Sequence, residues 1–320
     1  MGRLLRRGLA AALSAAVVVA GLAGTAGTAS AQQSLPVNYD SLSGYLSGLS
    51  SPTVPPPGAN NFSCQLSAAH PYPVILVNGT FANMNNNWRA ASPLLADSGY
   101  CVFAFNYGGA TPTSDIQGTG EIGASAQQLA SFVNQVLAAT GAAKVDLVGH
   151  SQGGMMPRYY INFLGGASKV DKLVALAPSN YGTTLDGLTT LAQILGLSSL
   201  INSGLAALCE ACVEQEQGSS FLAQLNAEPT VPSVSYTVIE STDDEVVTPY
   251  TNAFLPTAPN VTNITLQRQC PLDATDHLEI AYDPVAMADM LNALDPADPV
   301  RVPCLVVLPL TGPVGPVPAL

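Results

Sequence analysis

The sequence K-V-D-L-V-G-H-S-Q-G-G at residues 144–154 is an apolar run that ends on a serine between glycines. Gly149 and Gly153 form the pattern G-x-S-x-G around Ser151. This pattern suits a sharp turn from a strand into a helix, because a strained serine backbone needs neighbours without side chains. We predict that the hydroxyl of Ser151 is exposed on this turn and that the N–H of Gln152 opens the helix and stabilises an oxyanion. A plain tight turn is the alternative.

Strands and helices alternate along the rest of the chain. Apolar runs predict strands at 74–77, 102–105, 172–177, 234–239 and 263–269. Helical periodicity predicts helices at 88–98, 120–140 and 155–164. The alternation predicts an α/β fold with a mostly parallel central sheet, helices on both faces and functional residues at the carboxyl ends of the strands. Pro157 conflicts with the helix after Ser151 and is tolerated only near the first turn or as a kink.

The two ends of the chain differ in composition from its middle. Residues 1–31 combine three arginines, an apolar run and the tripeptide A-S-A, so we expect a cleaved signal peptide and a secreted, extracellular protein. Residues 32–61 are rich in Ser, Gly and Pro, which predicts an extended lead-in. We expect one catalytic domain at 62–304 and an apolar, proline-rich tail at 305–320.

Charge and hydropathy exclude several classes of partner. The formal net charge is −12, so nucleic acid is not an expected partner. Only 10% of the residues are charged, against about 25% in ordinary globular proteins, and such a surface suits contact with an apolar substrate. No run after residue 31 is long and apolar enough to span a bilayer, so we expect no stable membrane insertion. We expect a monomer.

The six cysteines of the chain are expected to form disulfides, because their number is even and the protein is expected to be exported. Six cysteines allow 15 connectivities. Pairing of sequence neighbours gives Cys64–Cys101, Cys209–Cys212 and Cys270–Cys304. The C-x-x-C spacing of the middle pair also occurs in metal and redox sites, but no second pair and no nearby histidine accompanies it. We therefore expect a small structural bridge and no metal.

A serine nucleophile needs a histidine base, and the chain offers three histidines. His70 precedes the first predicted strand, and His150 is held in the turn beside the serine. His277 remains by elimination. The acidic loop E-S-T-D-D-E precedes it, which gives the chain order Ser, Asp, His that serine hydrolases with an α/β fold use. Spacing alone leaves Asp243 and Asp244 as alternatives for the acid.

The first predicted strand ends at N-G-T-F, residues 78–81. Serine hydrolases with an α/β fold take a second oxyanion N–H from this loop. Thr80 can donate both its N–H and its hydroxyl there. A glycine turn without a catalytic role is the alternative.

Residues 183–227 interrupt the alternation with an apolar stretch at 185–208. We expect a helical cap insertion whose apolar side chains line an acyl pocket. A buried helical hairpin that packs on the core is the alternative.

Five segments together resemble the secreted class 2 lipases. They are L-V-N-G-T-F-A-N-M-N-N-N-W at 76–88, S-Q-G-G at 151–154, K-V-D-K-L-V-A-L-A-P at 169–178, S-T-D-D-E-V-V-T-P at 241–249 and D-H at 276–277. The resemblance covers about 64–304 and implies an α/β-hydrolase fold. It includes both oxyanion positions and the complete triad, which makes it specific.

Carried over by position, the resemblance implies Ser151 as nucleophile, Asp244 as acid and His277 as base. It implies Thr80 and Gln152 as oxyanion donors. It also supports two of the bridges, Cys64–Cys101 and Cys270–Cys304.

The resemblance implies a secreted serine ester hydrolase, in the first place a triacylglycerol lipase that acts on ester or lipid substrates at an oil–water interface without a cofactor. A short-chain carboxylesterase, a polyester hydrolase and a secreted acyltransferase would use the same residues. A non-catalytic binding protein is the alternative from another class, but binding would not require the whole constellation. The resemblance departs at His150, where a related lipase has a tryptophan that shapes the alcohol side of the pocket. Alcohol selectivity is therefore not carried over.

Overall fold

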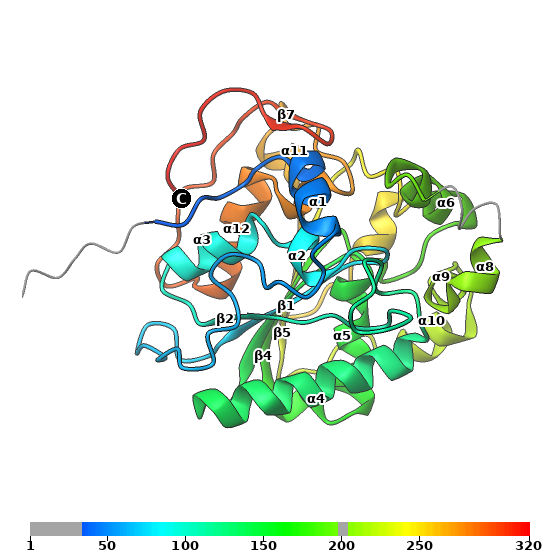
Figure 1. Ribbon diagram of the computed structural model, residues 1–320, viewed down its shortest axis with the longest axis horizontal. Helices are drawn as coiled ribbons and strands as arrows, with labels where there is room; N and C mark the ends of the chain where they lie inside the picture. The colour runs from blue at the N-terminus through cyan, green and yellow to red at the C-terminus, as the bar shows by residue number, and fades with distance from the viewer. Residues whose placement is uncertain (1–33, 198–203) are drawn as a thin grey trace, which may run out of the picture. The chain divides into compact units, whose positions relative to one another are not determined.

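The computed structural model describes residues 34–197 and 204–320, and a six-stranded parallel sheet forms the centre of this part of the chain (Figure 1). The strand order is β2-β1-β3-β4-β5-β6. The strands are β1 (Val74–Val77), β2 (Val102–Ala104), β3 (Val145–His150), β4 (Val170–Leu176), β5 (Ser235–Glu240) and β6 (Val261–Thr265). The predicted α/β fold is confirmed. The expected signal peptide at 1–31 lies outside the described residues.

Helices cover both faces of the sheet. Successive strand residues point to opposite sides, so each strand contributes side chains to the core on either face. Ile75 and Val77 pack in one core with α4 (Ile122–Thr140) and α5 (Gln152–Phe163). Val74 and Leu76 pack in the other core with α3 (Ala91–Asp97) and α12 (Pro284–Leu294). Figure 1 shows α4 on one side of the sheet and α3 and α12 on the other. Strands that are buried on both faces read as continuous apolar runs, which is why the sequence revealed them.

The chain between β4 and β5 is largely helical. It contains α6 (Leu185–Ile194), α8 (Leu205–Leu208), α9 (Glu210–Glu214) and α10 (Ser220–Leu225). The expected insertion at 183–227 includes all four helices, and its residues 198–203 are outside the described part. Leu188 and Leu191 of α6 are buried in the core beside α5. The inner face of α6 therefore packs on the domain, as the helical-hairpin alternative expected.

Two predictions about secondary structure are wrong. The lead-in at 32–61 is not wholly extended, because it contains α1 (Ser41–Leu49), where Asp40 caps the helix by accepting the N–H of Ser43 at 2.8 Å. The last strand ends at Thr265, and the next residues form α11 (Leu266–Gln269). The first helix was not predicted because its buried face consists mainly of small residues. The last strand was predicted to be too long because the buried Leu266 continues its apolar pattern.

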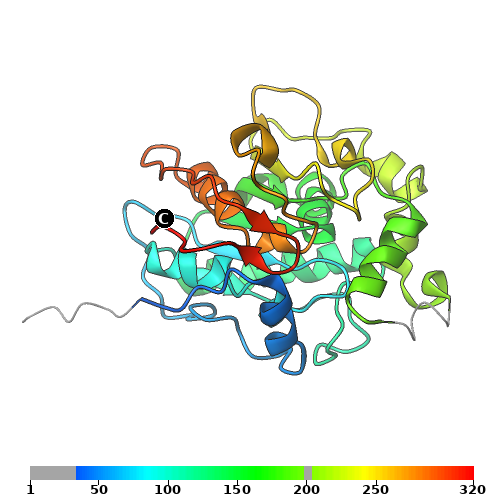
Figure 2. The same ribbon diagram turned by 90° about the horizontal axis from the view of Figure 1, so that it is seen from above.

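The tail at 305–320 folds back onto α1. It forms an antiparallel pair of short strands, β7 (Val307–Leu308) and β8 (Gly312–Pro313). The N–H of Leu42 donates to the carbonyl oxygen of Leu310 at 2.9 Å, and Figure 2 shows the two segments side by side. The remaining short elements are α2 (Met84–Asn87), η1 (Gly166–Ser168), η2 (Tyr250–Ala253) and η3 (Glu279–Ala281). Among the described helices, none has the length and hydropathy needed to cross a bilayer.

Candidate active site

Ser151 lies on the sharp turn between β3 and α5, with φ 55° and ψ −126°. A Cβ atom at Gly149 would lie 1.8 Å from the carbonyl oxygen of Gly153. A Cβ atom at Gly153 would lie 2.0 Å from the carbonyl oxygen of Val77. Both positions therefore require glycine, and the G-x-S-x-G pattern is a packing requirement of this turn. Helix α5 continues through Pro157 after the turn.

Three predicted side chains form a continuous chain of hydrogen bonds. Nε2 of His277 lies 3.0 Å from Oγ of Ser151, and Nδ1 lies 2.7 Å from Oδ2 of Asp244. A carboxylate only accepts hydrogen bonds, so Nδ1 carries the hydrogen and Nε2 accepts the serine proton. The other oxygen of Asp244 accepts the N–H groups of Val246 at 2.7 Å and Val247 at 2.8 Å. These bonds fix the carboxylate in the orientation that a general-base histidine needs.

The structure distinguishes the two acids that sequence spacing left open. Asp244 is 6% exposed and contacts the imidazole of His277. Asp243 is exposed, and its N–H donates to Oγ of Ser241 at 3.1 Å. The carboxylate beside the histidine is therefore that of Asp244.

The two buried histidines of the site have opposite pKa shifts. Burial favours the neutral form of His277, but the charge and hydrogen bond of Asp244 outweigh it and raise the pKa. Burial, followed by the charge of His277, lowers the pKa of His150 to about 3. Nε2 of the neutral His150 lies 2.8 Å from the carbonyl oxygen of His277 and donates to it. His150 thus holds the backbone of His277 in place.

Glu240 is a buried acid next to the triad that the sequence analysis did not single out. It is the last residue of β5 and is fully buried, and its Oε1 accepts the N–H of Ser241 at 2.8 Å. Burial and the charge of Asp244 raise the pKa of Glu240 well above its usual range. Glu240 therefore favours its protonated form more strongly than an exposed glutamate does. In the sequence, Glu240 looks like one more acid of a solvated loop.

The loop after β1 brings Thr80 to the serine. A Cβ atom at Gly79 would lie 3.1 Å from Cβ of Ser151, so the two segments are in direct contact. The backbone N–H groups of Thr80 and Gln152 donate to no other residue within 34–197 and 204–320. Free N–H groups beside a nucleophile can bind the oxyanion of a tetrahedral intermediate.

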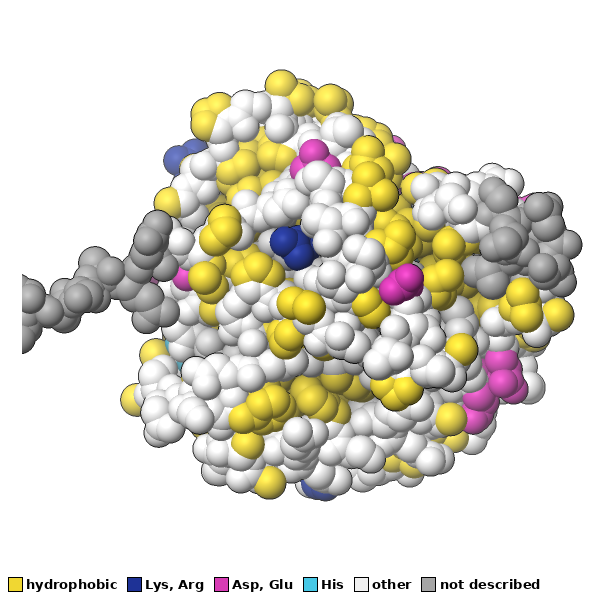
Figure 3. Space-filling model, viewed as in Figure 1, with side chains coloured by type: hydrophobic (Ala, Val, Ile, Leu, Met, Phe, Trp, Pro, Cys, Tyr) yellow, Lys and Arg dark blue, Asp and Glu magenta, His cyan; other side chains and the backbone are white. Residues whose placement is uncertain are grey.

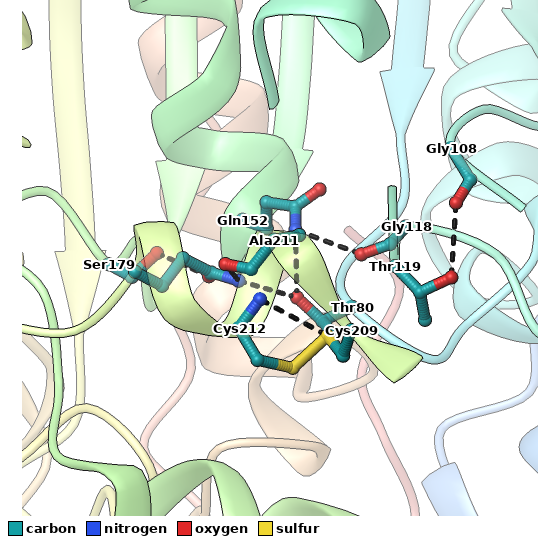
Figure 4. The surroundings of a disulfide bond; sticks show 10 residues. Thr80, Gly108, Gly118, Thr119, Gln152, Ser179, Cys209, Ala211 and Cys212 are labelled. Atoms are coloured by element: carbon teal, nitrogen blue, oxygen red, sulfur yellow. Dashed lines mark hydrogen bonds between the residues drawn. A yellow bond between two sulfur atoms is a disulfide. The ribbon is translucent and has the colours of Figure 1, made fainter. Parts of the chain in front are cut away.

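The hydroxyl of Thr80 accepts two side-chain amides. Nε2 of Gln152 lies 3.1 Å and Nε2 of Gln215 lies 3.0 Å from Oγ1 of Thr80, and Figure 4 shows the first of these bonds. An amide nitrogen only donates, so the hydrogen of the Thr80 hydroxyl stays available for a third partner. The sequence analysis missed Gln215, which is far from Thr80 in the chain and follows no motif.

Gln215 is itself fixed by the end of α9. Its Oε1 accepts the hydroxyl of Ser179 at 2.8 Å, and its Nε2 donates to the carbonyl oxygen of Ala211 at 3.0 Å. A disulfide joins Cys209 to Cys212 at the start of the same helix, next to Thr80 and Gln152 (Figure 4). The structure also joins Cys64 to Cys101 and Cys270 to Cys304.

An apolar pocket opens above the serine. It encloses about 390 Å³, including the part open to solvent. Its lining includes Tyr45 of α1, Leu191 of α6 and Leu195, which directly follows α6. The contribution of α6 agrees with the expectation that the insertion lines the site, whereas that of α1 was missed. In the described ranges, no group of three or more His, Cys, Asp or Glu side chains could hold a metal ion.

Comparisons with known proteins identify relatives of this chain. Two curated relatives, each named triacylglycerol lipase, are 44% identical to this chain over 97 residues. They come from Pseudarthrobacter phenanthrenivorans and Burkholderia plantarii, and the match covers 29% of this chain and 28% and 25% of theirs. The chain thus matches only about a quarter of the length of each relative.

Solved structures share the fold at low sequence identity. Aspergillus fumigatus lipase B has a TM-score of 0.58 at 21% identity, over 75% of this chain and 55% of that one. The mature form of Bacillus licheniformis lipase BlEst2 has a TM-score of 0.52 at 17% identity, over 76% and 95% of the two chains. The model of the family "Lipase (class 2)" matches residues 71–288, a range that holds the serine, the acid, the histidine and both oxyanion positions. The chain belongs to the class 2 lipase family.

Proposed function

We propose that this protein is a secreted serine carboxylic ester hydrolase that acts as a triacylglycerol lipase. The observation that carries the proposal is the hydrogen-bonded series Ser151, His277 and Asp244 at the base of an apolar pocket. The curated relatives support the substrate class over the segment that they share with this chain. We also propose that, within the family, the motifs of this chain are similar to those of Candida antarctica lipase B.

In the proposed reaction, Oγ of Ser151 attacks the ester carbonyl while Nε2 of His277 takes its proton. The imidazolium is stabilised by Asp244. The N–H groups of Thr80 and Gln152, with the hydroxyl of Thr80 as a third donor, hold the negative oxygen of the tetrahedral intermediate. His277 then returns the proton to the alcohol oxygen, the C–O bond breaks and an acyl-enzyme remains.

Water completes the cycle by the same steps. His277 takes a proton from water, the hydroxide adds to the acyl carbonyl, and collapse of the intermediate returns Oγ of Ser151 as the leaving group. The products are a carboxylic acid and the free serine. The residues need no cofactor or metal for these steps.

We expect a secreted monomer that meets its substrate outside the cell. Three disulfides fit an oxidising compartment. The apolar pocket residues Leu191, in α6, and Leu195, just after it, fit a hydrocarbon chain of the ester. An acyltransferase would use the same residues, and transfer to an added alcohol that outruns hydrolysis would favour it.

The test is hydrolysis of tributyrin, tricaprylin and triolein emulsions, followed by titration of the released acid. We expect the wild type to hydrolyse all three and Ser151→Ala to lose activity by several orders of magnitude while it keeps its melting temperature. Activity confined to soluble acetate and butyrate esters would replace the lipase by a short-chain esterase. Unchanged hydrolysis by Ser151→Ala would overturn the mechanism.

A further inference from the structure

Helix α1 turns its two glycines and Tyr45 inward and its leucines outward. It buries Ser41, Gly44, Tyr45 and Gly48. By contrast, Leu42 is 45% exposed and Leu46 is 61% exposed. Leu42, Leu46 and Leu49 follow one another at spacings of four and three residues, so they share one face of the helix. A helix that served only to cover the core would bury its leucines, because leucine gains most from removal from water.

The inward face fixes α1 directly on the wall of the catalytic pocket. A Cβ atom at Gly44 would lie 2.3 Å from the ring of Tyr282, and one at Gly48 would lie 2.6 Å from Cα of Asn86. The hydroxyl of Tyr45 donates to the carbonyl oxygen of Phe81 at 3.4 Å. The glycines thus let the helix backbone approach the pocket closely, and its leucine face lies at the pocket's edge.

The leucine face of α1 borders an apolar groove that extends the catalytic pocket. The groove is also lined by Leu195 at the end of α6, Leu278 and Leu310, and none of its lining residues is charged. Two of these, Leu195 and Leu278, also line the catalytic pocket, as do Ser41 and Tyr45. In Figure 3, hydrophobic side chains gather on the surface between the positions of α1 and α6. The groove and the catalytic pocket therefore form one continuous apolar surface.

The position of the groove indicates which half of an ester it meets. The alcohol oxygen must lie at Nε2 of His277 to receive its proton, so the alcohol half leaves on the side of His277. Leu278 follows this histidine directly and lines both the pocket and the groove. We propose that the groove between α1 and α6 binds the hydrocarbon chain of the alcohol half of the ester, a proposal that rests on the proposed function. For a triacylglycerol, this half is a diacylglycerol.

Two series of soluble esters test the proposal. In the first, the acyl group is butyrate and the alcohol grows from ethyl to hexyl. In the second, the alcohol is ethyl and the acid grows from butyrate to octanoate. Each series adds four methylenes, and four half-buried methylenes change kcat/KM on the order of tenfold. Concentrations stay below the solubility limit, so that adsorption to droplets does not contribute.

The variants are Leu46→Asp and Leu42→Asp in the groove, with Leu272→Asp as matched control. Leu272 is 59% exposed, close to the 61% of Leu46, and lies outside the groove. We expect both groove variants to lower the hexyl-to-ethyl ratio of kcat/KM at least threefold and to leave the octanoate-to-butyrate ratio unchanged. Leu272→Asp should change neither ratio.

Three results would overturn the proposal. One is an unchanged alcohol ratio in folded groove variants, and another is a change in the acyl ratio alone. Both would leave the proposed function intact, because the wild type would still hydrolyse esters. The third is a wild type without activity on any ester of either series, which would overturn the proposed function and this proposal together.

Discussion

Replacing Gln215 by Glu should remove one oxyanion donor without touching a residue of the triad. In the structure, Oγ1 of Thr80 accepts from Gln152 and Gln215, and its own hydrogen is free for the substrate oxyanion. A glutamate carboxylate at 215 cannot donate. The hydroxyl of Thr80 would then donate its hydrogen to that carboxylate and no longer to the oxyanion.

The size of the effect follows from the chemistry of such donors. Removal of one donor from an oxyanion hole costs about 10²–10³ in kcat. Two backbone N–H groups remain, so we expect Gln215→Glu to lower kcat by about 10² and to change KM by less than about threefold. Thr80→Val should give a similar loss. The double variant should be no slower than Thr80→Val, because both substitutions remove the same hydrogen bond.

The assay is steady-state hydrolysis of p-nitrophenyl butyrate, with kcat and KM determined separately. Gln217→Glu is the matched control, because Gln217 is exposed and gains the same charge two residues away. Since Gln215 is only 1% exposed, melting temperatures must show that each variant is folded. Gln215→Met removes the side-chain amide that donates to Thr80 without adding a charge, and it should lower kcat by less than Gln215→Glu. Effects of Gln215→Glu and Thr80→Val that multiply in the double variant would refute the reasoning.

Three further outcomes are expected. In the same assay, Asp244→Asn should lower kcat by about 10⁴ and Asp243→Asn should lower it by less than about twofold, because only Asp244 contacts His277. Equal losses in the two variants would contradict this assignment. Asp244 raises the pKa of His277, so the acid limb of kcat/KM should lie above pH 6.5 and shift to lower pH in Asp244→Asn; a pH–rate profile that does not shift would exclude this coupling. Burial raises the pKa of Glu279 from 4.5 to about 8. The protonated form of Glu279 contributes stability that is complete below pH 4.5 and is lost as the pH rises through 8. Glu279→Gln should therefore gain stability relative to the wild type between these pH values, by at most about 5 kcal/mol. Urea unfolding at pH 5, 7 and 9 measures it, and a constant difference would refute it.

Local patterns in the sequence were enough to predict the fold, the serine and the histidine, and they narrowed the acid to Asp243 or Asp244. The turn at Ser151 is encoded by the backbone contacts of Gly149 and Gly153, which admit no side chain. Strands β1, β2 and β3 are buried on both faces and so appear as largely apolar runs. His277 could be chosen because the chain has only three histidines. His70 precedes the first predicted strand, and His150 is held in the turn beside Ser151.

Contacts between distant parts of the chain were not predictable in the same way. Gln215 meets Thr80 across 135 positions of sequence, and no spacing rule links them. Helix α1 escaped detection because its buried face consists of small residues and Tyr45, which carry no apolar periodicity. The choice between Asp243 and Asp244 depends on burial, which adjacent acids in a loop do not reveal. Long-range packing thus supplies what local patterns leave open.

Covalent labelling of the serine tests the central claim most directly. A fluorophosphonate reacts with a serine only where a base activates its hydroxyl and an oxyanion hole stabilises the adduct. We predict that intact mass spectrometry finds one adduct per chain and that peptide mapping assigns it to Ser151, with loss of ester hydrolysis in step with labelling. Ser151→Ala should remain unlabelled. An adduct on another residue, or hydrolysis that persists in fully labelled protein, would contradict the assignment of Ser151 as the nucleophile.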